Sequence, residues 1–435
     1  MKLKLENGSS VYIVGGGPAG SFAAIHLLRY AEEHNLMLEV FIFEFRNGAN
    51  SGPAGCKGCA GVLSSTLLKN LSSIGIDIPG PLILDKLKSY VLHLPNIGGD
   101  VIIVNQPDPE RNIFSISRGN GPRISPSGPT VSFDDFLREQ AIIRGAKLIS
   151  SRVRTIEWGE HRPVVITNGD SYPADFLVLA TGVNSHTVLS PYFKYEPPET
   201  VIMVQDEFVK PDKLPDDTVA AFFDEPWDIF FGTMVPKGKY MNVSLFGRNW
   251  KRVRKDAVKK FMSSEAVRMG ELFTVTPENL CGCMPRIVVK PARKYYGDRW
   301  VAVGDAAVSR LYKDGIGSAY LTSSMAMHSA LTHGISESDF KKDYRKLCRS
   351  LSHDNFIGSI MFRIFSWMLE KPFIARSISR CVHEEMSLPP ARRVFTILIW
   401  GMLTGDYSYR FLLGKLFSMR GTVRFIKNFI IRHTM

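Results

Sequence analysis

Short apolar runs alternate with amphipathic segments along the first 335 residues. The runs at residues 10–14, 38–43, 175–180 and 300–303 are brief and rich in β-branched or aromatic residues, as expected of strands buried on both faces of a parallel sheet. The segment 21–28 follows the first run and has the length and apolar content of a helix packed on that sheet. This order predicts an α/β fold with a parallel sheet.

From residue 339 onward the pattern becomes helical. Breaks fall at Lys371-Pro372 and at Leu388-Pro389-Pro390, where proline cannot continue a helix. The segments 355–369 and 394–403 are markedly apolar, yet each is too short or too charged to cross a bilayer. We therefore expect a helical C-terminal extension.

A glycine-rich turn separates the first predicted strand from the first predicted helix. It reads Gly15-Gly16-Gly17-Pro18-Ala19-Gly20. Such a turn lets the backbone approach a pyrophosphate, which then lies at the N-terminus of the helix. The second predicted strand ends at Glu44, at the spacing expected of a carboxylate that binds an adenosine ribose. Arg46 either flanks the adenosine phosphate or is a solvated loop residue.

Two distant segments indicate that the dinucleotide expected at this site contains a flavin. One buried run closes on Thr181-Gly182, and another ends in Gly304-Asp305 and leads through Gly315-Ile316-Gly317 into a helix. Together these motifs resemble the flavoprotein hydroxylase-type fold, which aromatic hydroxylases, flavin-dependent halogenases and geranylgeranyl reductases share. The resemblance implies that FAD is bound and that Asp305 reaches its ribityl chain, with a helix N-cap as the alternative role. The resemblance also implies that the N-terminus of the helix after Gly315 points toward the pyrimidine end of the flavin.

A further segment indicates a branch of this fold. Residues 227–238 resemble the aromatic-x-x-Phe…Pro-Lys-Gly signature of geranylgeranyl reductases, which implies that Trp227, Phe230 and Pro236 line a substrate pocket. The alternative is a strand and turn with core aromatics. Cys59 stands where those reductases carry a Cys-Gly-Gly-type stretch beside the flavin. Two departures are Tyr312, where the family has proline, and Arg123, the nearest arginine before the segment 128–137.

The resemblance sets the expected architecture, which is α/β. A Rossmann-type FAD-binding lobe is interleaved with an antiparallel-sheet substrate lobe, and the helical extension follows. The expected parts are a discontinuous FAD-binding domain, a substrate domain and a helical C-terminal domain, with these ranges: 1–90, 130–190 and 285–335; 91–129 and 191–284; and 336–435.

Four of the six cysteines form two short pairs, Cys56-x-x-Cys59 and Cys281-Gly-Cys283. Three interpretations stay open: small buried side chains, a redox pair exchanging electrons with the flavin, or four thiolates holding zinc or an iron–sulfur centre. In the redox interpretation these four cysteines are the candidate catalytic residues. Cys348 and Cys381 lie in apolar helical contexts and are expected in the core.

By resemblance, the expected activity is reduction of carbon–carbon double bonds in an isoprenoid or isoprenoid lipid, with a proton supplied near Cys59. Two alternatives are a flavin monooxygenase of the aromatic hydroxylase type and an electron-transfer flavoprotein linking a thiol or metal centre to a membrane quinone. The single Rossmann fingerprint leaves the electron donor open among NAD(P)H, ferredoxin and a similar carrier.

Charge adds little to this picture. The formal net charge is +12, with basic stretches at residues 239–260 and 410–432. These are either solvated faces or sites for anionic phospholipid or a phosphorylated substrate. No nucleic-acid-binding signature accompanies them. The charged N-terminal residues lack the features of a signal peptide, so we expect a cytoplasmic protein, with peripheral binding to the inner face of a membrane as an option.

Overall fold

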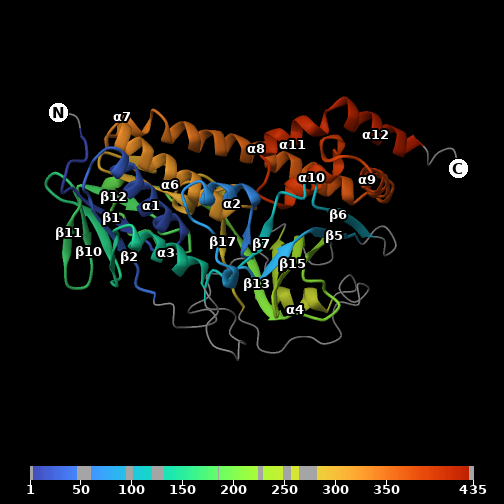
Figure 1. The fold of residues 1–435 in the computed structure, drawn as a ribbon, viewed down its shortest axis with the longest axis horizontal. Coiled ribbons are helices and arrows are strands. Elements are labelled where there is room, and N and C mark those ends of the chain that lie inside the picture. Colours follow the sequence, from blue (N-terminus) through green and yellow to red (C-terminus); the bar gives the residue numbers. More distant parts are fainter. Residues whose placement is uncertain are drawn as a thin grey trace.

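The computed structural model describes residues 3–46, 60–94, 101–119, 132–184, 186–223, 229–247, 256–263 and 282–430, with the backbone alone at 229 and 230. Two sheets lie side by side along the long axis of the molecule, and helices cover the upper side of both (Figure 1). The fold is α/β with a helical C-terminal region, as predicted.

The first sheet is the predicted parallel one. β1 is its centre and pairs in parallel with β12 on one side and β2 on the other. The order is β18-β19-β12-β1-β2-β8, with these bounds: β18 Tyr296–Gly297, β19 Trp300–Ala302, β12 Phe176–Leu179, β1 Ser10–Val14, β2 Glu39–Phe43 and β8 Lys147–Ile149.

Helices bury one face of this sheet, and a small sheet buries the other. α1 (Pro18–Glu33) packs against α6 (Gly315–Thr332) and α3 (Phe133–Ile143), and their apolar side chains form one core with the strands. On the opposite face, strands β9, β10 and β11 enclose a second core. Their bounds are β9 Thr155–Trp158, β10 Pro163–Ile166 and β11 Ser171–Pro173.

The second sheet has seven strands in the order β17-β13-β16-β15-β14-β5-β6. All its pairings are antiparallel except that of β14 with β5. The bounds are β17 Arg286–Lys290, β13 Glu199–Val209, β16 Tyr240–Gly247, β15 Ile229–Lys237, β14 Thr218–Phe222, β5 Ser89–His93 and β6 Val101–Asn105.

Two strands cross the boundaries that the sequence suggested. β17 belongs to the second sheet because it pairs with β13, although it lies inside the range 285–335 expected for the FAD-binding domain. β5 joins the same sheet through β14 and begins before residue 91. Strand pairing between distant segments decides both boundaries, and composition does not reveal such pairing.

A short sheet and α2 connect the two lobes. In this sheet β7 (Ile113–Ser115) lies between β3 (Val62–Leu63) and β4 (Asp85–Leu87). α2 (Ser65–Ser72) follows β3 directly and packs against α6.

The C-terminal helices form a layer over the second sheet. Prolines mark the breaks, as predicted: Pro372 begins α9, and Pro389 precedes a short turn. Trp400 is fully buried in this layer and packs edge-on against Tyr90 of β5. The bounds are α7 Glu337–Phe340, α8 Tyr344–Leu369, α9 Pro372–Glu385, α10 Phe395–Leu403, α11 Tyr409–Leu416 and α12 Met419–Ile430.

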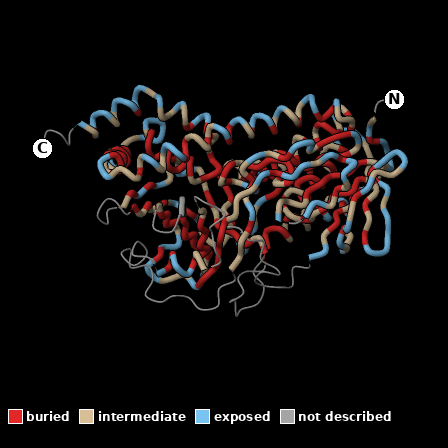
Figure 2. The backbone as a smooth tube through the Cα atoms, turned by 180° about the vertical axis from the view of Figure 1, so that it is seen from behind, coloured by how far each residue is buried: buried red, intermediate tan, exposed pale blue. Residues whose placement is uncertain are grey.

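The helical layer and the sheet share one core. The apolar face of β5, β6 and β14 packs against the buried side chains of α8 to α11. The opposite face of the sheet packs against α4 (Ala257–Met262). Buried residues run from the sheet into the helices, while the outer sides of α8 and α12 are exposed (Figure 2). Among the described helices, none is long and apolar enough to cross a membrane.

Candidate functional site

The glycine-rich turn has the backbone shape that the motif requires. Gly15 has a φ of +110°, in the left-handed region where side chains are strained. A Cβ on Gly20 would lie 1.8 Å from the carbonyl oxygen of Gly15, so α1 starts in direct contact with the end of β1. Gly17 is the N-cap of α1, and because it has no side chain it cannot cap the free amides of the first turn. The first turn of α1 therefore presents backbone amides, which favour an anion.

The structure brings the two distant motifs to this turn. Ala180, at the end of β12, is so close to Gly15 that a Cβ there would lie 2.4 Å from its carbonyl oxygen. Thr181 and Gly182 follow it directly. Gly304 has a φ of +60°, and its missing Cβ would lie 2.7 Å from the Cβ of Ala19. Asp305 thus stands beside the first turn of α1.

Glu44 is held in place at the end of β2. Its Oε2 accepts a hydrogen bond of 3.2 Å from the amide of Gly16, and its Oε1 accepts one of 3.0 Å from the amide of Arg46. The carboxylate is therefore fixed next to the turn, at the position predicted for a ribose contact. The Arg46 guanidinium lies over the ring of Phe45, and its contact with an adenosine phosphate stays a prediction.

Arg118 belongs to no motif in the sequence, yet it lies at this turn. Its guanidinium forms two parallel hydrogen bonds with the fully buried Asp134, of 2.9 Å from Nε and 3.0 Å from Nη2. A Cβ on Gly17 would lie 3.9 Å from Asp134 Oδ2 and 4.0 Å from Arg118 Nη2, so this pair faces the glycine-rich turn. The arginine noted in the sequence, Arg123, lies outside the described residues.

Asp305 belongs to the same group of residues. Burial raises the pKa of its carboxyl above the ordinary value, while the Ser309 hydroxyl and the charge of Arg118 oppose that rise. Arg118 thus lies close to the turn at Gly17, and its charge also opposes the rise in the pKa of Asp305 at the other end of the predicted site. A guanidinium in this position suits a diphosphate bound between them.

The α6 helix starts at Gly315, as the sequence predicted, but its N-terminus carries its own anion. Asp314, the N-cap residue, has a φ of +53°, and its carboxylate lies over the first turn, 2.3 Å from where a Cβ on Gly317 would be. Ser64 Oγ donates to this carboxylate at 3.1 Å, and Arg310 binds it at 3.0 Å. Ile316 is buried behind the turn. The predicted contact between this helix end and the flavin pyrimidine stays a prediction.

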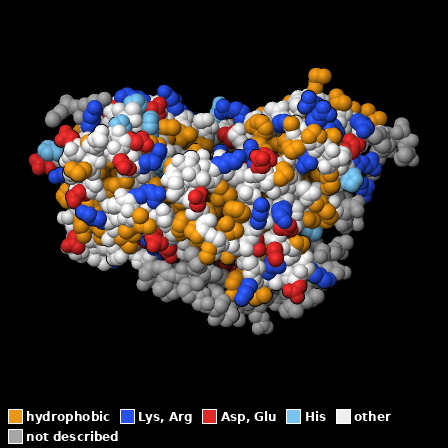
Figure 3. Space-filling view, viewed as in Figure 1, with side chains coloured by type: hydrophobic (Ala, Val, Ile, Leu, Met, Phe, Trp, Pro, Cys, Tyr) orange, Lys and Arg blue, Asp and Glu red, His pale blue; other side chains and the backbone are white. Residues whose placement is uncertain are grey.

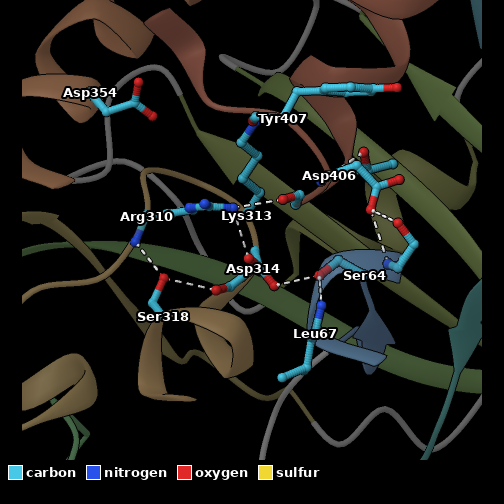
Figure 4. Close-up of polar contacts among 12 residues, drawn as sticks. Ser64, Leu67, Arg310, Lys313, Asp314, Ser318, Asp354, Asp406 and Tyr407 are labelled. Atoms are coloured by element: carbon cyan, nitrogen blue, oxygen red, sulfur yellow. Dashed lines mark hydrogen bonds and ion pairs between the residues drawn. The ribbon is translucent and has the colours of Figure 1, made fainter. Parts of the chain in front are cut away.

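Lys313, in the loop before α6, forms hydrogen bonds with the C-terminal helical region (Figure 4). Its ammonium group donates to the carbonyl oxygens of Gly401 and Tyr407 and lies 4.0 Å from the centre of the Tyr409 ring. Burial lowers the pKa of Lys313 to about 7. Nearby, Asp406 accepts hydrogen bonds from the amide and the hydroxyl of Ser65, of 2.9 and 2.7 Å. The start of α6, the start of α2 and the loop after α10 thus form one polar network.

The substrate side of the site is described in part. Trp227 lies outside the described residues, and Phe230 is described by its backbone alone. Pro236 is buried in β15, and strand alternation places its side chain on the opposite face from Lys237. Lys237 extends toward Gly61, where a Cβ would lie 3.5 Å from its Cε. The face of β15 toward Gly61 is therefore the one that carries Lys237, and Pro236 lies on the other face.

The paired cysteines are largely untested. Cys56, Cys59 and Cys281 lie outside the described residues. Cys283 is half-buried, and its carbonyl oxygen accepts a hydrogen bond of 2.9 Å from the amide of Gln205 in β13. In the part of the chain that the structure describes, no three His, Cys, Asp or Glu residues are grouped to hold a metal ion. The three interpretations of these cysteines stay predictions.

The two remaining cysteines are core residues, as predicted. Cys348 and Cys381 are fully buried in α8 and α9. Burial raises the pKa of each thiol to about 12, so both are protonated and unreactive at neutral pH.

Comparisons with known proteins identify the fold. No family model matches the chain, and no curated protein matches it in sequence. Among solved structures, a geranylgeranyl bacteriochlorophyll reductase-like protein from Thermoplasma acidophilum is similar, with a TM-score of 0.64 at 16% identity. The match covers 95% of this chain and 99% of that one.

Two further structures match over nearly the whole chain. The flavin-dependent halogenase CmlS has a TM-score of 0.61 at 17% identity, covering 97% of this chain and 78% of its own. A flavoprotein/dehydrogenase from Cytophaga hutchinsonii has a TM-score of 0.61 at 16% identity, covering 96% and 98%. The chain therefore has the fold that these flavoproteins, reductase-like and halogenase alike, hold in common.

Proposed function

We propose that the protein is an FAD-dependent oxidoreductase. The observation that carries this proposal is the contact between Ala19 and Gly304, which places Asp305 beside the glycine-rich turn. A dinucleotide bound at Gly15–Gly20 then extends its second half toward Asp305 and α6. The shared fold supports the same cofactor.

The residues present fit FAD. The first turn of α1 presents backbone amides suited to a diphosphate, Glu44 is held beside the turn where the motif predicts a ribose contact, and Arg118 adds a positive charge. Glycine at position 17 leaves room for this approach, because a Cβ there would narrow the space before Asp134 and Arg118. FAD supplies the electron-transfer chemistry, and the protein places it and excludes water.

For the reaction, we propose reduction of carbon–carbon double bonds in a hydrophobic, isoprenoid-like substrate. The reductase-like structure supports this choice, since that match spans almost all of both chains. The halogenase matches, at similar coverage, equally favour an oxygen-using enzyme of the monooxygenase type. The electron-transfer alternative depends on Cys56, Cys59 and Cys281, outside the described residues.

A direct test starts from cofactor binding. We expect the purified protein to bind FAD, and the Arg118→Lys variant to bind it about tenfold more weakly, because lysine keeps the charge but loses the paired hydrogen bonds. Arg144→Lys, at the end of α3, is the matched control and should bind FAD normally. FAD affinities are measured by fluorescence titration, and equal affinities of the two variants would show that Arg118 does not contact FAD. Absence of FAD binding by the parent protein would overturn the proposal.

Reoxidation separates the two reactions. The FAD-loaded protein is reduced anaerobically and then mixed with oxygen, with a prenyl alcohol or a phenol present. A reductase returns the saturated product and consumes little oxygen, whereas a monooxygenase consumes one oxygen per hydroxylated product. Oxygen uptake matched to hydroxylation would replace the reductase proposal with the monooxygenase one.

The outer surface of the C-terminal helices supports a membrane-derived substrate. Four exposed apolar residues of α12, with exposed fractions of 49 to 85%, form what we call the α12 stripe: Met419, Val423, Ile426 and Ile430. At about 100° per residue they fall within an arc of about 60°. Gly421 and Asn428, buried on the opposite side, mark the packed face of the helix. The stripe therefore faces away from the protein.

Charge around the α12 stripe favours an anionic bilayer. Arg420 and Lys427 flank it, and residues 356–430 contain eleven Lys and Arg against four Asp and Glu. On α8, Trp367 and Ile364 are also exposed, beside Arg363. Hydrophobic and basic side chains gather over this end of the molecule (Figure 3). We propose that this face binds anionic phospholipid, as amphipathic interfacial helices do, and that the substrate enters from the bilayer.

A further inference from the structure

One face of the seven-stranded sheet carries an unusual group of buried polar side chains. They stand on the neighbouring strands β13, β16 and β15, and each is at most 9% exposed. Strand alternation places all of them on the same face, since the register pairs residue 205 with 244, 207 with 242, and 233 with 244. We call this group the polar floor: Gln205, Glu207, Thr233, Lys237, Asn242 and Ser244.

The polar floor lies beside the predicted flavin and substrate site. Lys237 extends to Gly61, which follows the segment of Cys56 and Cys59. Phe246, on the same face of β16, lies with its ring centre 5.8 Å from that of Tyr312, in the loop before α6. The loops on both sides of the floor are thus those that the family resemblance assigns to the reactive end of the flavin.

Two atoms of the floor are buried without a partner. The Oε1 atom of Gln205 and the Nδ2 atom of Asn242 have no hydrogen bond, although the two residues are 2% and 0% exposed. The Oδ1 atom of Asn242 is satisfied, because Ser244 Oγ donates to it at 2.6 Å. Most buried polar groups in folded proteins are hydrogen-bonded, and each exception is costly. A donor and an acceptor left open on the same face indicate a ligand.

Charge restricts the kind of ligand. Lys237 forms a buried ion pair with Glu207, so the six side chains of the floor carry no net charge. A carboxylate or phosphate would lose its hydration and would meet the oxygens of Gln205 and Glu207. A plain hydrocarbon would leave both open atoms unsatisfied. The floor therefore suits a neutral group that both donates and accepts a hydrogen bond.

We propose that the polar floor binds a hydroxyl group of the substrate. The hydroxyl donates to Gln205 and accepts from Asn242, and if both amides are rotated by 180° it accepts from Gln205 and donates to Asn242. This inference rests on the proposed function, because it takes the substrate to lie between the floor and the flavin. It names the substrate class more closely: an alcohol or a phenol with an apolar body.

The test compares hydroxyl compounds with their methyl ethers. Geraniol and geranyl methyl ether form one pair, and 1-naphthol and 1-methoxynaphthalene form the other. Calorimetric titration into the FAD-loaded protein should show that at least one hydroxyl compound binds about 10- to 100-fold more tightly than its ether, because the ether cannot donate to Gln205. The pair that shows this difference separates a prenyl alcohol from a phenol.

Substitutions test the two residues directly. In Gln205→Leu and Asn242→Leu, the preferred hydroxyl compound should bind about tenfold more weakly and its ether about as before. Gln205→Leu should also unfold at a higher temperature than the parent, because it loses a buried oxygen that has no partner. A purely structural role for Gln205 would lower the unfolding temperature instead.

Thr218→Val is the matched control. Thr218 is buried in the same sheet, but its hydroxyl is hydrogen-bonded to Ser89 at 2.7 Å. This variant should lose stability and keep its affinity for the hydroxyl compounds. Equal affinity of the parent for hydroxyl compounds and ethers would overturn the proposal that the polar floor binds a hydroxyl group. The proposed function would still stand if the protein bound FAD and turned over substrate. Failure of FAD binding would overturn the proposed function itself.

Discussion

His26 illustrates how strongly a single residue responds to the packing around α1. Its side chain is fully buried, both ring nitrogens lack a hydrogen-bond partner, and its ring meets Tyr320 edge-on at 4.7 Å. Burial lowers the pKa of His26 to about 3. The folded protein therefore holds the neutral imidazole, whereas the unfolded chain takes up a proton near pH 6.5.

The sign of the pH effect follows from linkage. Between pH 6.5 and 3 the unfolded state binds one more proton at this position, so His26 makes the folded state less stable as the pH falls. We expect His26→Phe to weaken the dependence of the unfolding free energy on pH by up to about 1.4 kcal/mol per unit in this range. Urea unfolding at pH 7, 6 and 5 measures it, with the exposed His161→Phe as the control. Identical pH dependences of the His26 variant and the parent would contradict it.

Among single residues, the sequence predicted those whose role depends only on their neighbours in the chain. Gly15, Gly17 and Gly20 lie within six residues of one turn, and its backbone requires glycine at positions 15 and 20. Arg118 could not be found in this way, because its place depends on Asp134 and on the approach of both to Gly17. The orientation of Pro236 likewise depends on which face of β15 the other lobe covers.

Among the helices, α12 shows what a sequence pattern leaves open. Apolar and basic residues alternate in its sequence, and the structure shows an amphipathic helix. The pattern alone did not reveal that α12 packs with one face against α9 and leaves a second apolar face exposed. Packing against a distant helix decides which apolar residues remain at the surface.

The α12 stripe yields a prediction at this scale. Val423→Gln/Ile426→Gln should reduce binding to vesicles that contain anionic phospholipid by about tenfold or more, because it removes apolar side chains from the interface. Sedimentation with anionic and with neutral vesicles measures the effect. Ile142→Gln/Ile143→Gln, an exposed apolar pair at the C-terminal end of α3, is the control. Unchanged sedimentation of the α12 variant would contradict the membrane proposal.

The strand order of the second sheet was beyond prediction for a similar reason. β5 pairs in parallel with β14, although about 125 residues separate them. Each strand has an ordinary pattern by itself, and only the common core with the C-terminal helices fixes the neighbours.

For the whole molecule, the network around Lys313 and Asp406 joins the C-terminal helices to the first lobe. Asp406 binds Ser65 of α2 and also accepts from Trp400 Nε1 at 3.2 Å. Asp314 and Arg310 link the same region to α6. The helical extension is therefore bound to the starts of α2 and α6 through polar contacts as well as through its apolar core.

Breaking this network should separate the parts of the molecule. We expect Asp406→Ala to lower the unfolding free energy by about 3 to 5 kcal/mol, because it leaves three buried donors, the amide and hydroxyl of Ser65 and the indole N–H of Trp400, without their acceptor. Differential scanning calorimetry should then show the C-terminal helices unfolding before the rest. Asp343→Ala, which removes a surface pair with His333, is the control. A single unchanged transition in the Asp406 variant would contradict this coupling.

The order of strands in the first sheet also governs how the protein is made. β1 leaves the ribosome before its neighbour β12 and before β19, which follow about 165 and 290 residues later. Until then the apolar sides of β1 and α1 lack most of their partners, so the nascent chain exposes them during synthesis. A truncated or stalled chain that ends before β19 lacks Gly304 and Asp305, and molecular chaperones are expected to bind it. Under the proposed function, FAD therefore binds only after β19 has been made.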